Sequence, residues 1–200
     1  MGFEDALIAL LEEPEEVAQF FDAVTDFKIA TARKVKQYFH PETFTNYDDI
    51  ATERGLFMSE DVYRELIKPY HTKLHQAVRE LDMIPVQHTC GKCDMLVKDI
   101  IETGAQAWVS VQPMNDIESI LKQYAGQLCI IGGYDTNGKP GMQNTSMEER
   151  FAEIERCVKQ YGIYPGYVLF MFVIMSTYDP KEKADTMRPM IQKFMELTGR

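Results

Sequence analysis

The chain has 200 residues, of which 45% are hydrophobic and 26% are charged, and its formal net charge is −10 at pH 7. These values are typical of a soluble globular protein that is long enough to bury a sizeable core. The negative charge would repel a phosphate backbone, so we expect no nucleic-acid partner, and the lack of an apolar run of roughly 18 residues argues against a membrane-spanning helix.

The start of the chain and its cysteines indicate a cytoplasmic protein. Residues 1–5 contain two acidic side chains and no basic one, unlike a secretory signal peptide. In a reducing compartment, the four cysteines are expected to be thiols or metal ligands rather than disulfides.

In chain order, the sequence predicts helices that alternate with short apolar strands. The first helix opens at residues 13–16, where Pro and acidic residues mark a first turn, and nears its end at the basic residues 33–36. A long helix is expected from a cap at Ser59 through Leu81, with a kink at Pro69. Further helices are expected over 94–103, 116–124, 146–161 and 180–197, and strands over 43–49, 83–90, 108–112, 128–135 and 167–175.

This alternation predicts parallel β-α-β units in a single domain over residues 1–200. Most of the strands are continuously apolar, as expected when helices cover both faces of a sheet. Polar residues gather at the carboxyl ends of the strands, which form the catalytic face of a β/α barrel. They are Asp48, Asp49, His88, Cys90, Gln112, Tyr134, Asp135 and Ser176. A closed barrel has eight strands and roughly 250 residues, so about five strands predict a partial (β/α)8 TIM-barrel-like α/β fold.

One imidazole and two thiols lie within six residues of one another, in the run QHTCGKC from Gln87 to Cys93. Residues two apart in a strand point to the same face, so His88 and Cys90 should aim together, and Cys93 can fold back from the turn at Gly91. Imidazole and thiolate suit zinc, and three protein ligands with one open position are typical of a catalytic site. The alternative is a reduced cysteine pair beside a hydrogen-bonded core histidine.

Other potential ligands have simpler interpretations. His71 and His75 are four residues apart on one predicted helix, a spacing that can bind a metal, but no Glu follows His71 and we expect an ordinary helix surface. Cys129 lies in an apolar run and Cys157 lies in the middle of a helix, so both are expected to be core residues.

Several segments resemble the uroporphyrinogen decarboxylase superfamily. They are DDIATERGLFMS at residues 48–59, Tyr63–Glu65, Lys68–Tyr70 and Gly132–Asp135. His88-Thr89-Cys90-Gly91 resembles the His-x-Cys-Gly motif of the cobalamin-dependent methyltransferase branch. The resemblance covers nearly the whole chain but only the C-terminal part of a family member, and the first three or so strands of the barrel are missing.

The resemblance implies that His88 and Cys90 bind zinc, which activates a thiol or similar acceptor for a methyl group from a corrinoid, carried by a partner protein. The family takes its third ligand from a cysteine near the last strand, but residues 167–177 contain none. We expect Cys93 to be the third ligand instead, because it lies close to Cys90 in the sequence; this is our inference and not a feature of the family. Asp49 is expected to act as a catalytic or supporting carboxylate beside a zinc-bound histidine, and Gln112 and Asp135 to line the cofactor site.

Two alternatives remain open. One is a uroporphyrinogen decarboxylase-like enzyme that acts on a tetrapyrrole, although the arginines and aspartate of that branch lie in the part that is missing. The other is an inactive half-barrel that completes itself as a homodimer or with a complementing N-terminal chain.

Overall fold

The computed structural model of the protein describes residues 2–177 and 179–199. The chain divides into two compact units, Met1–Val109 and Ser110–Arg200. The expectation of a single domain stays a prediction.

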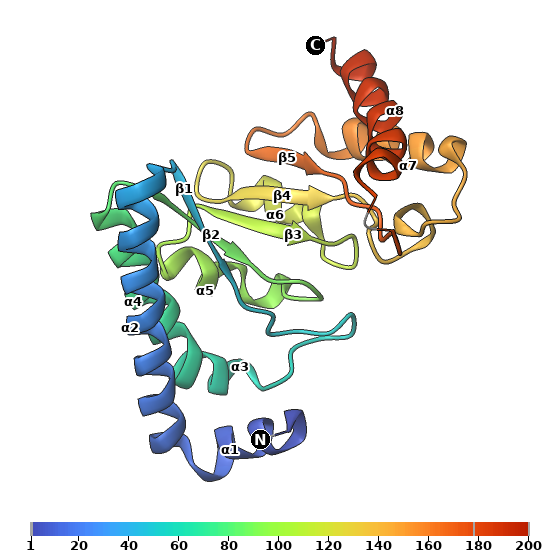
Figure 1. Ribbon diagram of the computed structural model, residues 1–200. Coiled ribbons are helices and arrows are strands. Elements are labelled where there is room, and N and C mark those ends of the chain that lie inside the picture. The colour runs from blue at the N-terminus through green and yellow to red at the C-terminus, as the bar shows by residue number, and fades with distance from the viewer. Residues whose placement is uncertain (1, 178, 200) are drawn as a thin grey trace. The chain divides into compact units, whose positions relative to one another are not determined.

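The first unit opens with two helices, α1 (Phe3–Glu12) and α2 (Pro14–Phe39) (Figure 1). The second of these was predicted, because Pro14 stands in its first turn together with Glu15 and Glu16. The first was not predicted from the sequence. The two helices meet at Glu13, which ends α1 and precedes α2.

The long helix predicted after Ser59 forms in three pieces. Ser59 caps it as expected, since its Oγ accepts a hydrogen bond from the backbone amide of Val62. The pieces are α3 (Glu60–Val62), the π-helical turn η1 (Tyr63–Ile67) and α4 (Lys68–Glu80). The π-turn lies directly before Pro69, which has no amide hydrogen to continue the regular hydrogen-bonding ladder. The structure thus has an irregular turn directly before Pro69, and the predicted kink of the helix axis stays a prediction.

Helices α2 and α4 pack against each other through a small apolar cluster. Its buried members are Ile29, Ala32, Leu74, Val78 and Met83. Ile29 and Ala32 lie at helical spacing on α2, Leu74 and Val78 lie at helical spacing on α4, and Met83 follows α4, so burial of the two helix faces holds the pair together.

Three parallel strands form the sheet of the first unit. They are β1 (Thr43–Tyr47), β2 (Ile84–His88) and β3 (Ala107–Val111), the last of which runs across the boundary between the units. In register, Tyr47 lies beside His88 and His88 beside Val109. The helical segments η2 (Asp94–Leu96) and α5 (Val97–Glu102) connect β2 to β3, as a β-α-β crossover requires.

The second unit repeats the alternation. Helix α6 (Ile117–Gln123) begins at its cap Asp116, and strand β4 (Cys129–Gly133) pairs in parallel with β5 (Tyr167–Phe170). Between these strands lie the 3-10 turn η3 (Lys139–Gly141) and helix α7 (Met147–Tyr161), and helix α8 (Pro180–Thr198) follows β5. The predicted capping box of α7 is present, since Ser146 and Glu149 cap each other's backbone amides.

One strand prediction is wrong in length and burial. The sequence predicts a buried strand over residues 167–175, but β5 ends at Phe170 and its residues alternate between partly buried and exposed. The side chains of Phe170 and Phe172 are 40% and 51% exposed. An apolar run therefore marked a strand here, but not one with both faces covered.

Five strands alternate with helices and every described pairing between these strands is parallel, which confirms an α/β, partial TIM-barrel-like fold. Among the described residues, no helix combines the length and the apolar character needed to cross a membrane.

Candidate metal centre

The register of β1 and β2 brings two short polar segments together in the first unit. The chain leaves β1 at Tyr47, next to the end of β2 at His88. The backbone amide of Asp48 donates to the carbonyl oxygen of His88, so the two exits stay paired for one residue beyond β1. Asp49 and Cys90 follow directly on these two exits.

Asp49, His88 and Cys90 offer donor atoms that all lie within 4.8 Å of one another. The Cys90 Sγ lies 3.6 Å from the Nε2 of His88, and that Nε2 lies 3.7 Å from the Oδ1 of Asp49. The same Oδ1 accepts a hydrogen bond of 2.8 Å from the backbone amide of Cys90. The predicted convergence of His88 and Cys90 on one side of the chain is thus observed.

Thr89 fixes the backbone between these two side chains. It is fully buried, its Oγ1 accepts from the amide of Ile50, and its carbonyl oxygen accepts from the indole N–H of Trp108. Because Thr89 is held on the inner face, the alternation of an extended chain places His88 and Cys90 on the opposite face.

A glycine permits the turn that follows Cys90. Gly91 has a φ of +87°, and a Cβ at this position would lie 2.5 Å from the carbonyl oxygen of Thr52. The backbone amide of Lys92 donates to that same oxygen at 2.8 Å. A side chain at Gly91 would therefore push the Cys90 segment away from the Ala51–Thr52 segment.

The electrostatics favour a neutral imidazole at His88. Burial lowers the pKa of His88, and the nearby Asp49 carboxylate offsets only part of this shift. A neutral ring has one nitrogen lone pair available, which is the form that binds metals.

The third sequence candidate, Cys93, lies outside this donor group. Its side chain is fully buried, and its Sγ contacts the Thr89 Oγ1 at 3.9 Å and the Cys90 carbonyl oxygen at 3.5 Å. Burial raises the pKa of the Cys93 thiol to about 12. The structure therefore offers Asp49, not Cys93, as the third donor beside His88 and Cys90.

Comparison with known proteins identifies the family. Residues 1–187 match the family model described as uroporphyrinogen decarboxylase (URO-D). The chain belongs to the uroporphyrinogen decarboxylase family. Comparison with curated proteins gives no significant match.

A solved structure has the same fold as the present chain. It is a methyltransferase from Methanosarcina mazei, which superposes with a TM-score of 0.71 at 13% sequence identity. The match covers 96% of this chain and 54% of the methyltransferase, so the chain spans about half the length of that protein.

The two residues expected to line a cofactor site lie in the second unit of this family member. Gln112 is buried, and its Nε2 donates to the Oγ1 of Thr136 at 3.3 Å. Asp135 stabilises a turn, because its Oδ1 accepts from the amide of Gly138 at 2.7 Å. The expectation that Gln112 and Asp135 bind a cofactor stays a prediction.

Sequence reasoning missed a buried polar network behind Asp48. The Oδ2 of Asp48 lies 2.9 Å from the Nε2 of His71, whose Nδ1 lies 3.4 Å from the hydroxyl of Tyr63. Burial raises the pKa of Asp48, but His71 and Lys28 outweigh this effect and the pKa is lowered.

The expectation that His71 and His75 form an ordinary helix surface is wrong, because both are buried. The available signal was their position on the same face of α4 as the core residues Leu74 and Val78.

Proposed function

We propose that this protein is a metal-dependent methyltransferase whose metal is zinc, held by Asp49, His88 and Cys90. The observation that carries the proposal is the convergence of their three donor atoms within 4.8 Å at the ends of β1 and β2. Carboxylate, imidazole and thiolate are all established zinc ligands, and three of them leave one position for a substrate. With a neutral His88, the anionic Asp49 and Cys90 would balance the two positive charges of the metal.

When bound, zinc would supply a Lewis acid that keeps a substrate thiol deprotonated and nucleophilic near pH 7. The protein's own residues prepare this position. Cys90 must release its thiol proton to become a ligand. Asp49 holds the backbone amide of Cys90 at 2.8 Å and so keeps the two donors in register. Gly91 and Thr89 fix the turn on either side of Cys90.

We propose a methylated corrinoid on a partner protein as the methyl donor, and a thiol or similar group as the acceptor. This part rests on the likeness of the His88-Thr89-Cys90-Gly91 segment to the corrinoid-linked branch of the family. The structural similarity to a methyltransferase is consistent with it.

The second candidate is a decarboxylase that acts on a tetrapyrrole, and the family match over residues 1–187 favours it. It predicts binding of a carboxylated porphyrin without any metal. The two carboxylates at the end of β1 oppose it, because they would repel the many carboxylates of such a substrate. A titration followed by porphyrin absorbance tests this candidate, and the absence of a spectral change would remove it.

Zinc analysis of the purified protein tests the leading proposal. The wild-type protein should retain about one zinc per chain after gel filtration, and C90S should lose most of it. C129S is the matched control, because Cys129 lies in β4 of the second unit and should leave the zinc content unchanged. A zinc-free wild-type protein after incubation with zinc, or equal zinc in C90S, would refute the proposal.

A further inference from the structure

An apolar cavity lies in the first unit between α1, the start of α2 and the segment that follows β1. Its volume is about 540 Å³, and twelve of its sixteen lining residues are apolar. Small-molecule sites are typically mostly apolar cavities of roughly 300–1,000 Å³. The cavity therefore has the size and the surface of a site for a compact organic ligand.

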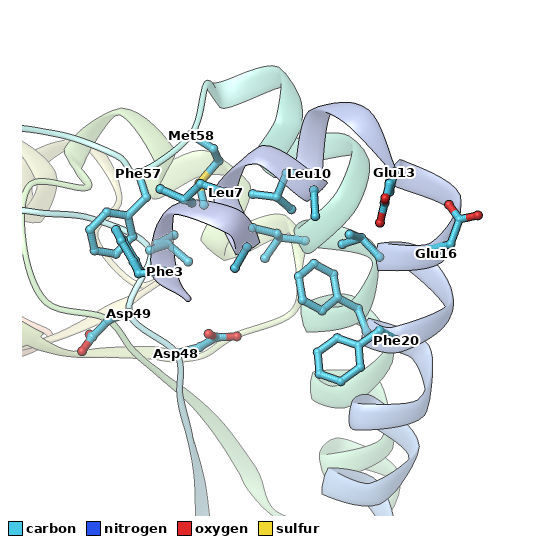
Figure 2. Close-up of a pocket in the computed structure, with 16 residues that line it drawn as sticks. Phe3, Leu7, Leu10, Glu13, Glu16, Phe20, Asp48, Asp49, Phe57 and Met58 are labelled. Carbon is cyan, nitrogen blue, oxygen red and sulfur yellow. The ribbon is translucent and has the colours of Figure 1, made fainter. Parts of the chain in front are cut away.

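Aromatic rings stand at two places in its wall. Phe3 of α1 meets Phe57 edge to face, with ring centroids 5.2 Å apart, and Phe20 lies next to Phe21 in α2. Figure 2 shows Phe3 and Phe57 at one end of the cavity and Phe20, which projects from α2, towards the other end. Such rings accommodate apolar groups and attract cations over their faces.

All the charged residues in the described lining are acidic. They are Glu13, Glu16, Asp48 and Asp49, and no lysine, arginine or histidine is among the described residues that line the cavity. Lys28 does lie 3.8 Å from the Oδ2 of Asp48, but it lines the adjoining cavity of about 70 Å³, which shares Asp48 with this one. An anionic ligand would meet four carboxylates, of which Asp48 alone has a lysine beside it, and this is unfavourable next to a largely apolar wall.

The carboxylates of Asp48 and Asp49 point in different directions. In Figure 2 the Asp48 carboxylate points towards the side of α2, whereas the Asp49 carboxylate points away from it. Asp49 belongs to the donor group with His88 and Cys90. The Oδ2 of Asp48 is occupied by His71, and its Oδ1 makes no hydrogen bond to another described residue. Asp48 is thus a fixed carboxylate with one acceptor oxygen still available to a ligand.

We propose that this cavity binds a small apolar molecule with a cationic or hydrogen-bond-donating end, which Asp48 accepts, and that it excludes carboxylates and sulfonates. The apolar body of the ligand lies against α1 and the phenylalanine rings. That this ligand is the substrate of the zinc site rests on the proposed function, because Asp49 lines the cavity and also belongs to the donor group. Binding of the ligand itself does not depend on zinc.

Three probes of matched size test the charge preference by calorimetry on the full chain. They are 2-phenylethylamine, 2-phenylethanol and 3-phenylpropionate, which carry a cationic, a neutral and an anionic end. The amine and the alcohol should bind with saturation, and the carboxylate should bind at least about tenfold more weakly. Equal binding of all three probes, tighter binding of the carboxylate, or no binding of the amine and the alcohol would overturn the proposal.

Variants locate the binding. D48N should reduce the preference for the amine over the carboxylate, whereas E4Q should not, because Glu4 lies in α1 outside the cavity lining. A6F places a ring in the cavity and should abolish binding of the amine and the alcohol. The fluorescence of Trp108 verifies that each variant is folded. An A6F protein that is folded and still binds both probes would place them elsewhere and refute the proposal.

C90S separates this proposal from the zinc proposal. It should lose zinc and retain the binding of 2-phenylethylamine. Zinc binding without probe binding would refute the cavity site and leave the zinc proposal standing. Probe binding without zinc binding would refute the zinc proposal and leave the cavity site standing.

Discussion

Cys90 and Cys93 are three residues apart, yet their thiols lie in different surroundings. Cys90 is partly exposed beside the imidazole of His88, whereas Cys93 is fully buried and its pKa is raised to about 12 by burial. The thiolate is the reactive form of cysteine, so burial and a raised pKa both suppress reaction. We predict that iodoacetamide at pH 7.5 alkylates Cys90 at least about tenfold faster than Cys93, as measured by peptide mass spectrometry.

Zinc supplies the control for this measurement. If Cys90 is a ligand, added zinc should slow its alkylation and leave that of Cys129 unchanged. Faster alkylation of Cys93 than of Cys90 would contradict the geometry described for the turn at Gly91. Protection by zinc of both Cys90 and Cys93 would favour the ligand set expected from the sequence.

The sequence predicts part of this site for a simple reason. The alternation of an extended chain is a local property, so the spacing of His88 and Cys90 is enough to place their side chains together. The third donor does not follow from spacing, because the direction of the chain after Cys90 depends on Gly91 packing against Thr52, a contact across 39 residues. Proximity in sequence suggested Cys93 as the third donor, whereas the pairing of β1 with β2 brings Asp49 next to His88 and Cys90.

At the scale of elements, a buried carboxylate connects three helical segments of the first unit. Asp99 of α5 accepts hydrogen bonds from Arg64 in η1 and from Lys68 in α4, and its side chain is 7% exposed. Burial raises the pKa of Asp99, but the hydrogen bonds and charges of Arg64 and Lys68 outweigh it, and the pKa is lowered. The ionised form is therefore the one that stabilises the folded unit.

We predict that D99N lowers the free energy of unfolding at pH 7 by about 2 kcal/mol, because it leaves two cations without their buried partner. A carboxyl group whose pKa is lowered by folding stabilises above its unfolded pKa, about 3.9, and loses this contribution as the pH falls through its folded pKa. The difference between wild type and D99N should therefore be full at pH 7 and shrink below about pH 4. Urea unfolding followed by Trp108 fluorescence measures it.

E102Q is the control for D99N. Glu102 also pairs with Lys68, but its side chain is 46% exposed, and solvent screens such a pair. Its replacement should change the free energy of unfolding by well under about 1 kcal/mol. Equal effects of E102Q and D99N, or a D99N effect that is independent of pH, would show that the charge of Asp99 is not what connects the helices.

The elements that the sequence predicted are those with local start signals. Pro14 and its acidic neighbours mark α2, Ser59 marks α3, and the Ser146–Glu149 capping box marks α7. Helix α1 has ten residues, a length that is marginal for an isolated helix, and it packs in the folded unit through contacts such as the Phe3–Phe57 ring pair. The early end of β5 likewise depends on tertiary structure and not on the apolar character of residues 171–175.

At the scale of the whole molecule, the alternation of strands and helices was enough to predict a partial β/α barrel. Most of the strands were recognised as apolar runs, and their parallel pairing followed from the helices between them. What the rest of a barrel would be made of does not follow from these 200 residues. The chain aligns with 54% of a structurally similar methyltransferase, so its five strands correspond to part of that protein.

The edge of the sheet in the first unit leads to the last prediction. Among the described residues, β1 has β2 as its strand neighbour, and the side chain of Tyr47 at its end is 71% exposed. In helix α2, Phe27 and Tyr38 are 72% and 66% exposed. An edge strand and exposed aromatic rings each favour association with a further chain. We therefore predict that the purified protein sediments as a homodimer at micromolar concentration, or does so as a heterodimer once a complementing chain is added.

A variant on α2 tests whether this surface mediates the association. T45P removes the amide of a residue in the middle of β1 but would also disturb the pairing with β2, so F27K is the better choice because Phe27 is exposed on α2. F27K adds a charge to the apolar surface without touching the strand, and it should raise the dissociation constant at least about tenfold in sedimentation velocity experiments. Y38K, at an exposed aromatic residue near the C-terminal end of α2, is the matched variant that shows how far the interface extends. A wild-type protein that is monomeric at every concentration and remains so with any complementing chain would show that the open edge of β1 needs no partner.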